Sequence, residues 1–489
     1  MNQWKDILTK FANFLILILL SLSCAVSHVT GKKQFMLISE KQEIEMGKQY
    51  DPQVIATFGE YKNDRLSGYV QQKGVEMGKI SHWPSLEYHV KVLDSPVVNA
   101  FAVPGGYIYL TRGILAQLNN EAELEGIIGH EMGHITSRHM VSQMSKQEVG
   151  QLLVVAGMIA SEDFRQYANY AMMGMQLLFL KFSRDDERAA DRLGVEYSSK
   201  LGYDAHRMAD FFMVLNKMNM NSDQAGVPTF LSTHPDPGDR YTAVNKLATT
   251  WQDSLGLTSW KVNQDSYLNL INGIVYGVDP RQGYVEGNTF YHPELKLRFS
   301  FPLGWQLENM PAQVNMAPKD GRAFMVFALA PGNTLQESAW SALNDLGLTL
   351  QQSKNTTVNG MPALVATSTQ VSQDPNTGQQ QTLRVLSYFI NYNATNYVFH
   401  GVATETDFNA YAHTFESAMN TFGKLTDPAK LNVKPEKILV KPVPKAGTVA
   451  DAFKSMGVAQ SKMNEMALLN ELELTDKIPA GRLIKIIGE

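Results

Sequence analysis

The amino-acid sequence predicts an α+β protein of several domains, and three observations support that prediction. The chain has 489 residues, enough for about two to four domains at roughly 100 to 200 residues each. Apolar residues recur with a helical period through most of residues 36–255, and an alternating, strand-like pattern begins near residue 286. Hydrophobic residues make up 44% of the chain and charged residues 19%, as in a folded protein rather than a disordered one.

Charge and cysteine content exclude two classes of site. The formal net charge of -5 at pH 7 gives the protein no basic field, so we expect no nucleic-acid partner. The chain contains a single cysteine, Cys24, which rules out an intramolecular disulfide and any zinc site built from several cysteines. A metal site in this chain must therefore use histidine and carboxylate side chains.

Residues 1–24 have the order of a secretory signal peptide. Two lysines precede an apolar run at residues 14–20, which is shorter than the roughly 20 residues of a permanent membrane span. Cys24 follows a small residue, as in the lipobox of bacterial lipoproteins, although Ser21 stands where leucine is preferred. We expect export to the periplasm, with a lipid on Cys24 anchoring the chain to the outer membrane; ordinary cleavage nearby is the alternative.

The region up to residue 255 is predicted to be mostly helical, with one short strand. Residues 121–143 carry apolar side chains at helical spacing, and the aromatic and β-branched run at residues 106–111 favours a strand. Two further apolar runs, at residues 152–160 and 172–182, are each only about ten residues long. We interpret these runs as buried or interfacial helices rather than membrane spans.

The chemistry is predicted from Gly129-His130-Glu131-Met132-Gly133-His134. Histidines four residues apart lie on one helical face, so both imidazoles can reach one zinc, and Glu131 then faces the open coordination position. Glu187 is the candidate third ligand, and Asp191, one turn later, could hold a ligand histidine through its second N–H. The alternative for these two carboxylates is a solvated, charged helix.

Four segments, in this order, resemble the M48 family of zinc metallopeptidases, in particular the exported bacterial branch that includes periplasmic protease-chaperones of outer-membrane biogenesis. They are residues 99–106, the histidine motif extended to Ser137-Arg138-His139, residues 187–191, and Thr233-His234-Pro235 with Arg240. The resemblance covers roughly residues 36–255. It implies a mostly helical, gluzincin-like domain with a small edge-strand sheet, one Zn2+ per chain, and endopeptidase activity. The tetratricopeptide tail of that branch is replaced here by other sequence, so substrate choice is not carried over.

In the mechanism that the resemblance implies, zinc held by His130, His134 and Glu187 acidifies a water molecule. Glu131 accepts the proton of that water and returns it to the leaving amine. His234 is the second candidate catalytic residue. It could donate to the oxyanion of the tetrahedral intermediate, or bind zinc as an extra ligand that keeps the enzyme latent; a structural histidine is the alternative.

The remaining candidates surround this centre. Arg240 could orient the His234 loop or the carboxylates, with a solvated helix surface as the alternative, and His139 is expected to be structural because it lies off the ligand face. The strand at residues 106–111 is a candidate edge strand that pairs with extended substrate. The alternative is an ordinary hairpin edge. The candidate substrate-binding residues are Gly105, Gly106, Tyr107 and Ile108.

Two further segments follow the peptidase-like region. Residues 286–425 are predicted to form an α+β domain, in which the segment at residues 301–305 weakly resembles the Mog1/PsbP fold. Residues 430–489 comprise a basic linker and a segment that resembles a LysM βααβ module, in which Glu471 replaces the turn glycine. Peptidoglycan binding and a purely structural version of this module both remain open.

The sequence thus predicts a zinc-dependent endopeptidase that hydrolyses peptide bonds of periplasmic or outer-membrane proteins in quality control or assembly. The alternative is a latent peptidase that acts as a chaperone or a peptidoglycan-associated scaffold. Expected partners are protein or peptide substrates, peptidoglycan through residues 430–489, and a membrane only through the lipid anchor. A membrane-integral peptidase would need spans that the short apolar runs do not supply.

Overall fold

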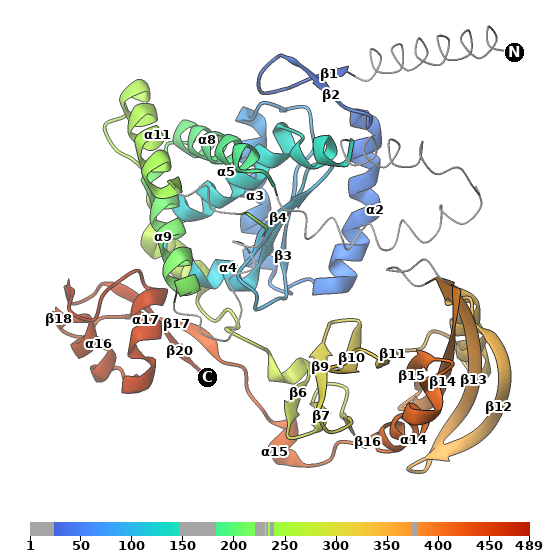
Figure 1. Ribbon diagram of the computed structural model, residues 1–489. Helices are drawn as coiled ribbons and strands as arrows, with labels where there is room; N and C mark the ends of the chain where they lie inside the picture. Colours follow the sequence, from blue (N-terminus) through green and yellow to red (C-terminus); the bar gives the residue numbers. More distant parts are fainter. Residues whose placement is uncertain (1–23, 146–181, 221–229, 231–232, 235–238, 374–379) are drawn as a thin grey trace, which may run out of the picture. The chain divides into compact units, whose positions relative to one another are not determined.

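The computed structural model describes residues 24–145, 182–220, 230, 233–234, 239–373 and 380–489. They form two compact units (Figure 1). The first unit combines the residues up to Ile55 and Gly59–Gly277 with Lys437–Gly488, and the second consists mainly of Val278–Glu436. The protein is α+β with several sheets, as predicted. Within the described ranges, no helix has the length and apolarity that a membrane crossing needs; the apolar runs discussed above lie outside these ranges, except for Phe182.

Helices dominate the first unit. They are α2 (Glu40–Phe58), α3 (Asp64–Ile80), α4 (Arg112–Gln117), α5 (Glu121–Thr136), α8 (Arg184–Lys200), α9 (His206–Met220), α11 (Arg240–Leu255) and α12 (Gln264–Ile271). The predicted helix at residues 121–143 begins where expected, because the Asn120 side chain caps it by accepting from the Glu123 amide. It breaks at residues 137–138, where Arg138 has a φ of 56° that a right-handed helix cannot continue.

A three-stranded sheet of β3 (His89–Leu93), β4 (Ala100–Val103) and β5 (Tyr107–Thr111) packs against these helices. β5 lies in the centre, parallel to β3 and antiparallel to β4. The prediction that residues 106–111 form an edge strand is therefore wrong. The edge strands of the described sheet are β3 and β4, and β4 is the one that contacts α5 more.

The glycines between β4 and β5 serve the fold itself. Gly105 and Gly106 have φ values of 81° and 96°, which close the turn between the two strands. A Cβ on Gly106 would lie 2.2 Å from the carbonyl oxygen of Glu87, and one on Gly105 would lie 2.9 Å from that of Glu43. The close approach that these glycines permit is thus to backbone of this chain.

Small residues allow α5 and α8 to pack very closely (Figure 1). A Cβ on Gly129 would lie 3.0 Å from the Gly194 Cα, and one on Gly133 would lie 3.1 Å from the Ala190 Cα. Both contacts are shorter than ordinary carbon–carbon packing. The glycines that flank the two histidines of α5 therefore let α8 bring its own side chains within reach of them.

The C-terminal segment belongs to the first unit. It contains β17 (Lys437–Pro442), β18 (Gly447–Thr448), α16 (Val449–Ser455), the 3-10 turn η2 (Gln460–Lys462), α17 (Met463–Leu469), β19 (Lys477–Ile478) and β20 (Leu483–Gly488). β17 pairs with β20 and β18 with β19, both antiparallel. Two strands precede the two helices and two follow them, and the predicted likeness to a LysM βααβ module stays a prediction.

This segment shares the core of the peptidase-like region. Ile438, Phe453 and Ile484 are buried in the same apolar cluster as Leu115. The Lys485 ammonium group is fully buried and donates to the carbonyls of residues 116, 117 and 118 at 2.8–3.0 Å, at the end of α4, where helix carbonyls lack partners in the helix. Residues 437–488 are therefore bound to the first unit, and the predicted domain boundaries remain predictions.

The second unit is mainly β-structure. A seven-stranded antiparallel sheet has the order β12-β13-β14-β15-β11-β10-β9, and a four-stranded antiparallel sheet has the order β16-β8-β7-β6. The strands are β6 (Tyr284–Glu286), β7 (Thr289–His292), β8 (Leu297–Ser300), β9 (Trp305–Asn309), β10 (Gln313–Pro318), β11 (Ala323–Leu329), β12 (Thr349–Val358), β13 (Met361–Gln373), β14 (Gln380–Tyr392), β15 (Thr395–Thr404) and β16 (Gly423–Lys424).

Three helices and a 3-10 turn complete the second unit: α13 (Leu335–Asp345), α14 (Phe408–Met419), α15 (Pro428–Leu431) and η1 (Pro280–Gln282). α14 lies near the end of the second unit. Its buried Phe415 and Met419 join Phe299 and Phe399 in one core. At the other end of the chain, Cys24 begins β1 (Cys24–Val26), which pairs with β2 (Lys33–Phe35).

Candidate metal centre

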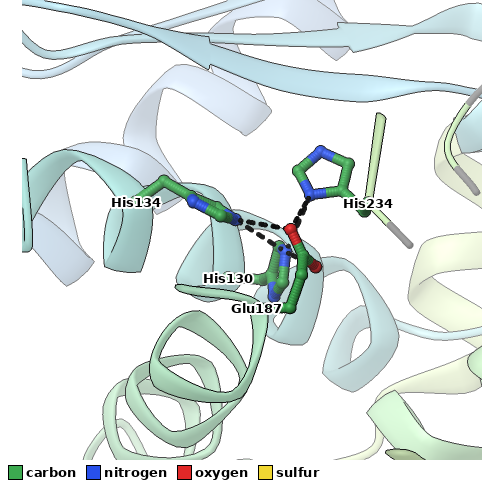
Figure 2. Close-up of side chains that lie close together, drawn as sticks. All are labelled: His130, His134, Glu187 and His234. Atoms are coloured by element: carbon green, nitrogen blue, oxygen red, sulfur yellow. Dashed lines mark hydrogen bonds and ion pairs between the residues drawn. The ribbon is translucent and has the colours of Figure 1, made fainter. Parts of the chain in front are cut away.

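Four buried side chains from three parts of the first unit meet at one point (Figure 2). His130 and His134 lie one turn apart on α5, Glu187 lies in the first turn of α8, and His234 lies in the segment before α11. Each offers one nitrogen or oxygen atom, and these four atoms all lie within 4.8 Å of one another. None of the four residues is more than 3% exposed.

Four of the distances between these atoms lie between 3.0 and 3.5 Å. His130 Nε2 lies 3.1 Å from His134 Nε2 and 3.2 Å from His234 Nδ1. Glu187 Oε1 lies 3.0 Å from His234 Nδ1 and 3.5 Å from His134 Nε2. Ligands bound to zinc at 2.0–2.1 Å in a tetrahedron are about 3.3 Å apart, so the spacing fits one zinc ion.

The proton on His130 can be assigned from its neighbours. Its Nδ1 lies 2.9 Å from Asp191 Oδ1, and a carboxylate can only accept, so Nδ1 carries the hydrogen. Arg240 keeps Asp191 ionised and in place through contacts from Nε and Nη2 at 2.7–3.1 Å. The lone pair of His130 therefore lies on Nε2, directed at the other three groups.

The orphaned carboxylate oxygens agree with a cation at this point. Both oxygens of Glu131 and Oε2 of Glu187 are buried without a hydrogen-bond partner among the residues that the structure describes, although Arg240 Nη2 and His130 Nε2 each lie 3.5 Å from Glu187 Oε2. Such groups are costly in a protein interior unless a charge or a reacting group offsets them. Histidine nitrogens with one carboxylate are also a ligand set that zinc favours.

The surroundings of Glu131 and Glu187 shift the pKa values of these two carboxyl groups in opposite directions. Burial raises the pKa of Glu131, and the neighbouring histidines offset only part of this rise. Burial alone would raise the pKa of Glu187 too, but the surrounding imidazoles and Arg240 hold it below its usual value. Glu187 is thus set up to stay an anionic ligand, whereas Glu131 retains a high affinity for a proton.

The structure brings together most of the predicted site residues. His130, Glu131, His134, Glu187 and His234 form the centre, and Asp191 and Arg240 lie directly behind it. His234 Nε2 is 3.6 Å from Glu131 Oε1. The alternative of a solvated helix is wrong for the two α8 carboxylates, because Glu187 and Asp191 are 0% and 4% exposed.

The prediction that residues 105–108 bind substrate along an open strand edge is wrong. Gly105 and Gly106 form an internal turn, and Tyr107 and Ile108 lie in the central strand β5 with 8% and 0% of their surface exposed. They lack the open strand edge that pairing with a substrate requires. Arg240 is buried as well, which overturns the alternative of a solvated position for that residue.

His139, expected to lie off the ligand face, is not one of the four grouped residues. The sequence analysis did not anticipate that its Nδ1 lies 3.0 Å from Nδ1 of His134, on the side of that ring away from the other three residues. This contact depends on the helix break at Ser137–Arg138, and no sequence signal predicts that break because neither residue is glycine or proline.

Comparisons with known proteins fit this geometry. Residues 64–248 match the model of peptidase family M48. The beta-barrel assembly-enhancing protease of Escherichia coli (strain K12) is 27% identical over 213 residues, which is 42% of this chain and 43% of that protein. The mitochondrial metalloendopeptidase OMA1 of Homo sapiens is 24% identical over 269 residues, half of each chain. The chain thus spans about half the length of these relatives, or less.

Solved structures give weaker similarity. The cyanobacterial PsbP protein of Synechocystis sp. PCC 6803 is 11% identical, with 28% of this chain and 91% of that chain covered. The Ran-binding protein Mog1p of Saccharomyces cerevisiae is 12% identical, with 30% and 99% covered. Both have a TM-score of 0.22. Scores this low carry no argument, so the Mog1/PsbP resemblance stays a prediction.

Proposed function

Since the chain contains a domain of peptidase family M48, we propose that it is a zinc-dependent endopeptidase. Its substrates would be periplasmic or outer-membrane proteins, in quality control or assembly. The observation that carries the proposal is the buried cluster of three histidines and Glu187, beside a Glu131 carboxylate that accepts no hydrogen bond from the described residues. Relatives named beta-barrel assembly-enhancing protease support the substrate class.

His130, His134 and Glu187 would hold the metal. When bound, zinc supplies a Lewis acid for the scissile carbonyl and acidifies a water molecule. Asp191 and Arg240 keep the His130 imidazole in the orientation that ligation needs.

Glu131 is the general base in this proposal. Burial raises the pKa of its carboxyl group, so it accepts a proton more readily near neutral pH than an exposed glutamate does. It takes one proton from the attacking water and passes it to the leaving amine, so that the same side chain serves both halves of peptide hydrolysis.

A second candidate function, a latent peptidase that acts as a chaperone or scaffold, is favoured by the position of His234. Its Nδ1 supplies the fourth candidate ligand atom of the cluster, 3.2 Å from His130 Nε2 and 3.0 Å from Glu187 Oε1. Catalytic zinc sites keep the fourth position for water or substrate. For catalysis His234 would leave this position, and it could then donate to the oxyanion.

Location and recruitment are further parts of the proposal. Export through residues 1–24, a lipid on Cys24, and peptidoglycan binding by residues 430–489 would keep the protease at the outer membrane. A lipid anchor is tested by substituting Cys24→Ser and following the protein in membrane fractions. Glycan binding is tested by sedimenting the full mature chain with purified peptidoglycan.

The central test is zinc content and casein cleavage, measured in the same samples of the mature protein. One zinc per chain is expected in the wild type, and Glu187→Ala should lose both zinc and cleavage. Glu131→Gln should keep zinc and lose cleavage, which serves as the matched control for the fold. Zinc without cleavage in the wild type, with cleavage gained in His234→Ala, would favour latency, and no zinc in any sample would refute the proposal.

A further inference from the structure

His139 occupies an unexpected place next to the metal centre. On an unbroken helix, a residue five positions after His134 would be rotated from it by about 140°. The break at Arg138, with its φ of 56°, redirects the chain. A new helical segment begins at residue 139, and the His139 ring returns to meet the His134 ring edge-on, with centroids 5.0 Å apart and planes at 76°.

Two contacts of His139 bear on which ring nitrogen carries its hydrogen. Its Nδ1 lies 3.0 Å from His134 Nδ1, and its Nε2 lies 3.6 Å from Asp186 Oδ1. The other oxygen of Asp186 accepts from the hydroxyl of Ser183 at 2.7 Å, in the capping box at the start of α8. Asp186 is therefore fixed in position by the helix that also carries Glu187.

These contacts assign the protons. The Asp186 carboxylate lies 3.6 Å from Nε2, beyond hydrogen-bond range, and its negative charge favours the tautomer of His139 that carries the hydrogen on Nε2. The lone pair of His139 then lies on Nδ1. Because the contact between two nitrogens at 3.0 Å needs one donor, His134 Nδ1 carries the hydrogen. The lone pair of His134 consequently lies on Nε2, which faces His130 Nε2 at 3.1 Å and Glu187 Oε1 at 3.5 Å.

We propose that His139, held by Asp186, is a positioning residue that fixes the tautomer and orientation of His134. It does for His134 what Asp191 does for His130, with a neutral imidazole in place of the carboxylate. This inference rests on the proposed zinc site. Groups behind a metal-bound histidine commonly contribute about 10- to 100-fold to metal affinity, so the effect of His139 should be measurable in binding as well as in catalysis.

The experiment compares zinc dissociation constants, obtained by competition with a chelator, for the mature wild type and two variants. His139→Phe keeps a ring but no acceptor, and should bind zinc about 10- to 100-fold more weakly. His139→Asn can place its side-chain oxygen close to the former Nδ1 and should recover most of the affinity. His206→Phe is the matched control, since His206 also pairs with an aspartate, Asp204 Oδ1 at 2.8 Å, away from the ligands, and should bind zinc as the wild type does.

The outcomes separate the inference from the proposed function. A wild type that binds no zinc refutes the proposed function itself. Zinc binding that is equal in wild type and His139→Phe, or equally weak in the phenylalanine and asparagine variants, overturns the role of His139 while leaving the zinc site intact. Thermal unfolding of the zinc-free proteins checks that each variant is folded.

A second pair of variants makes the test independent of substitutions at His139. Asp186→Ala removes both the cap of α8 and the contact to His139, whereas Ser183→Ala weakens the same cap and leaves Asp186 Oδ1 facing His139. The inference expects Asp186→Ala to bind zinc at least several-fold more weakly than Ser183→Ala. Equal affinities in this pair would overturn it.

Discussion

The substitution Gly129→Ala tests whether close packing of α5 on α8 builds the metal centre. The new Cβ would lie 3.0 Å from both the Cα and the carbonyl oxygen of Gly194. Carbon atoms in ordinary contact are about 3.5–4.0 Å apart. Because the atoms met are backbone, no side-chain rotation relieves the overlap, and the two helices must separate by about 0.5–1 Å.

The expected effect follows from that shift. Glu187 moves with α8 while His130 and His134 move with α5, and metal–ligand distances tolerate only about 0.2 Å. We expect zinc affinity to fall about tenfold or more, equivalent to about 1.4 kcal/mol. For the zinc-free protein, alanine gains up to about 1 kcal/mol of helix propensity and overpacking costs about 1–3 kcal/mol. The net loss of stability is therefore only about 0–2 kcal/mol.

The assay measures zinc affinity by chelator competition and the free energy of unfolding of the zinc-free protein in urea. Gly68→Ala is the matched control, because Gly68 lies in α3 and a Cβ there meets no atom within 4 Å. It should stabilise the protein by about 0.5–1 kcal/mol and leave zinc affinity unchanged. If both variants are equally stabilised and bind zinc as the wild type does, the packing argument is refuted.

Three further predictions concern charge and packing. Burial raises the pKa of Glu125 to about 7, so the folded state holds its proton while the unfolded state loses it, and stability falls between about pH 4.5 and 7 by at most about 1.4 kcal/mol per pH unit. When the free energy of unfolding is measured in urea, Glu125→Gln should lack this part of the loss of stability with rising pH. If the pH profiles of the variant and the wild type are parallel, the prediction is contradicted. Arg240→Lys replaces the two guanidinium nitrogens that contact Asp191 with a single ammonium group, and should weaken zinc binding severalfold in chelator competition. Arg188→Lys, on the outer face of α8, should leave zinc binding unchanged. Phe415→Ala in the second unit should lower the free energy of unfolding by about 3–5 kcal/mol. Trp340→Ser should lower it by less than about 0.5 kcal/mol, because Trp340 is 70% exposed. Similar unfolding midpoints for the two variants would contradict this prediction.

The metal centre could be predicted largely from local patterns. The i, i+4 spacing places His130 and His134 on one helical face, and the same spacing places Glu187 and Asp191 on another. The small residues beside them then allow the two faces to meet. His234 and Arg240 lie in separate segments, and their assignment depended on resemblance to a family rather than on spacing.

Other features of the fold and the site depend on contacts between distant segments, which no local sequence pattern indicates. Arg138 adopts a left-handed conformation without being glycine, so the return of His139 to His134 could not be predicted. A strand pattern such as residues 107–111 indicates a strand but not its neighbours, which is why β5 was placed at an edge. Lys485 lies in a segment that suggests a separate module, and only the folded chain brings it to the end of α4.

The pairing of Val275 with Lys437, together with backbone hydrogen bonds between Gly273, Ile274 and Ile438, has a consequence for the order in which the protein is made. The second unit is an insertion whose two ends are adjacent in the first unit. A ribosome must therefore complete the whole insertion before β17 and β20 exist to close the core around Ile438 and Ile484. Most of the first unit is translated before the insertion, yet its core is completed only after it, and a chain interrupted within the insertion lacks the strands that finish that core.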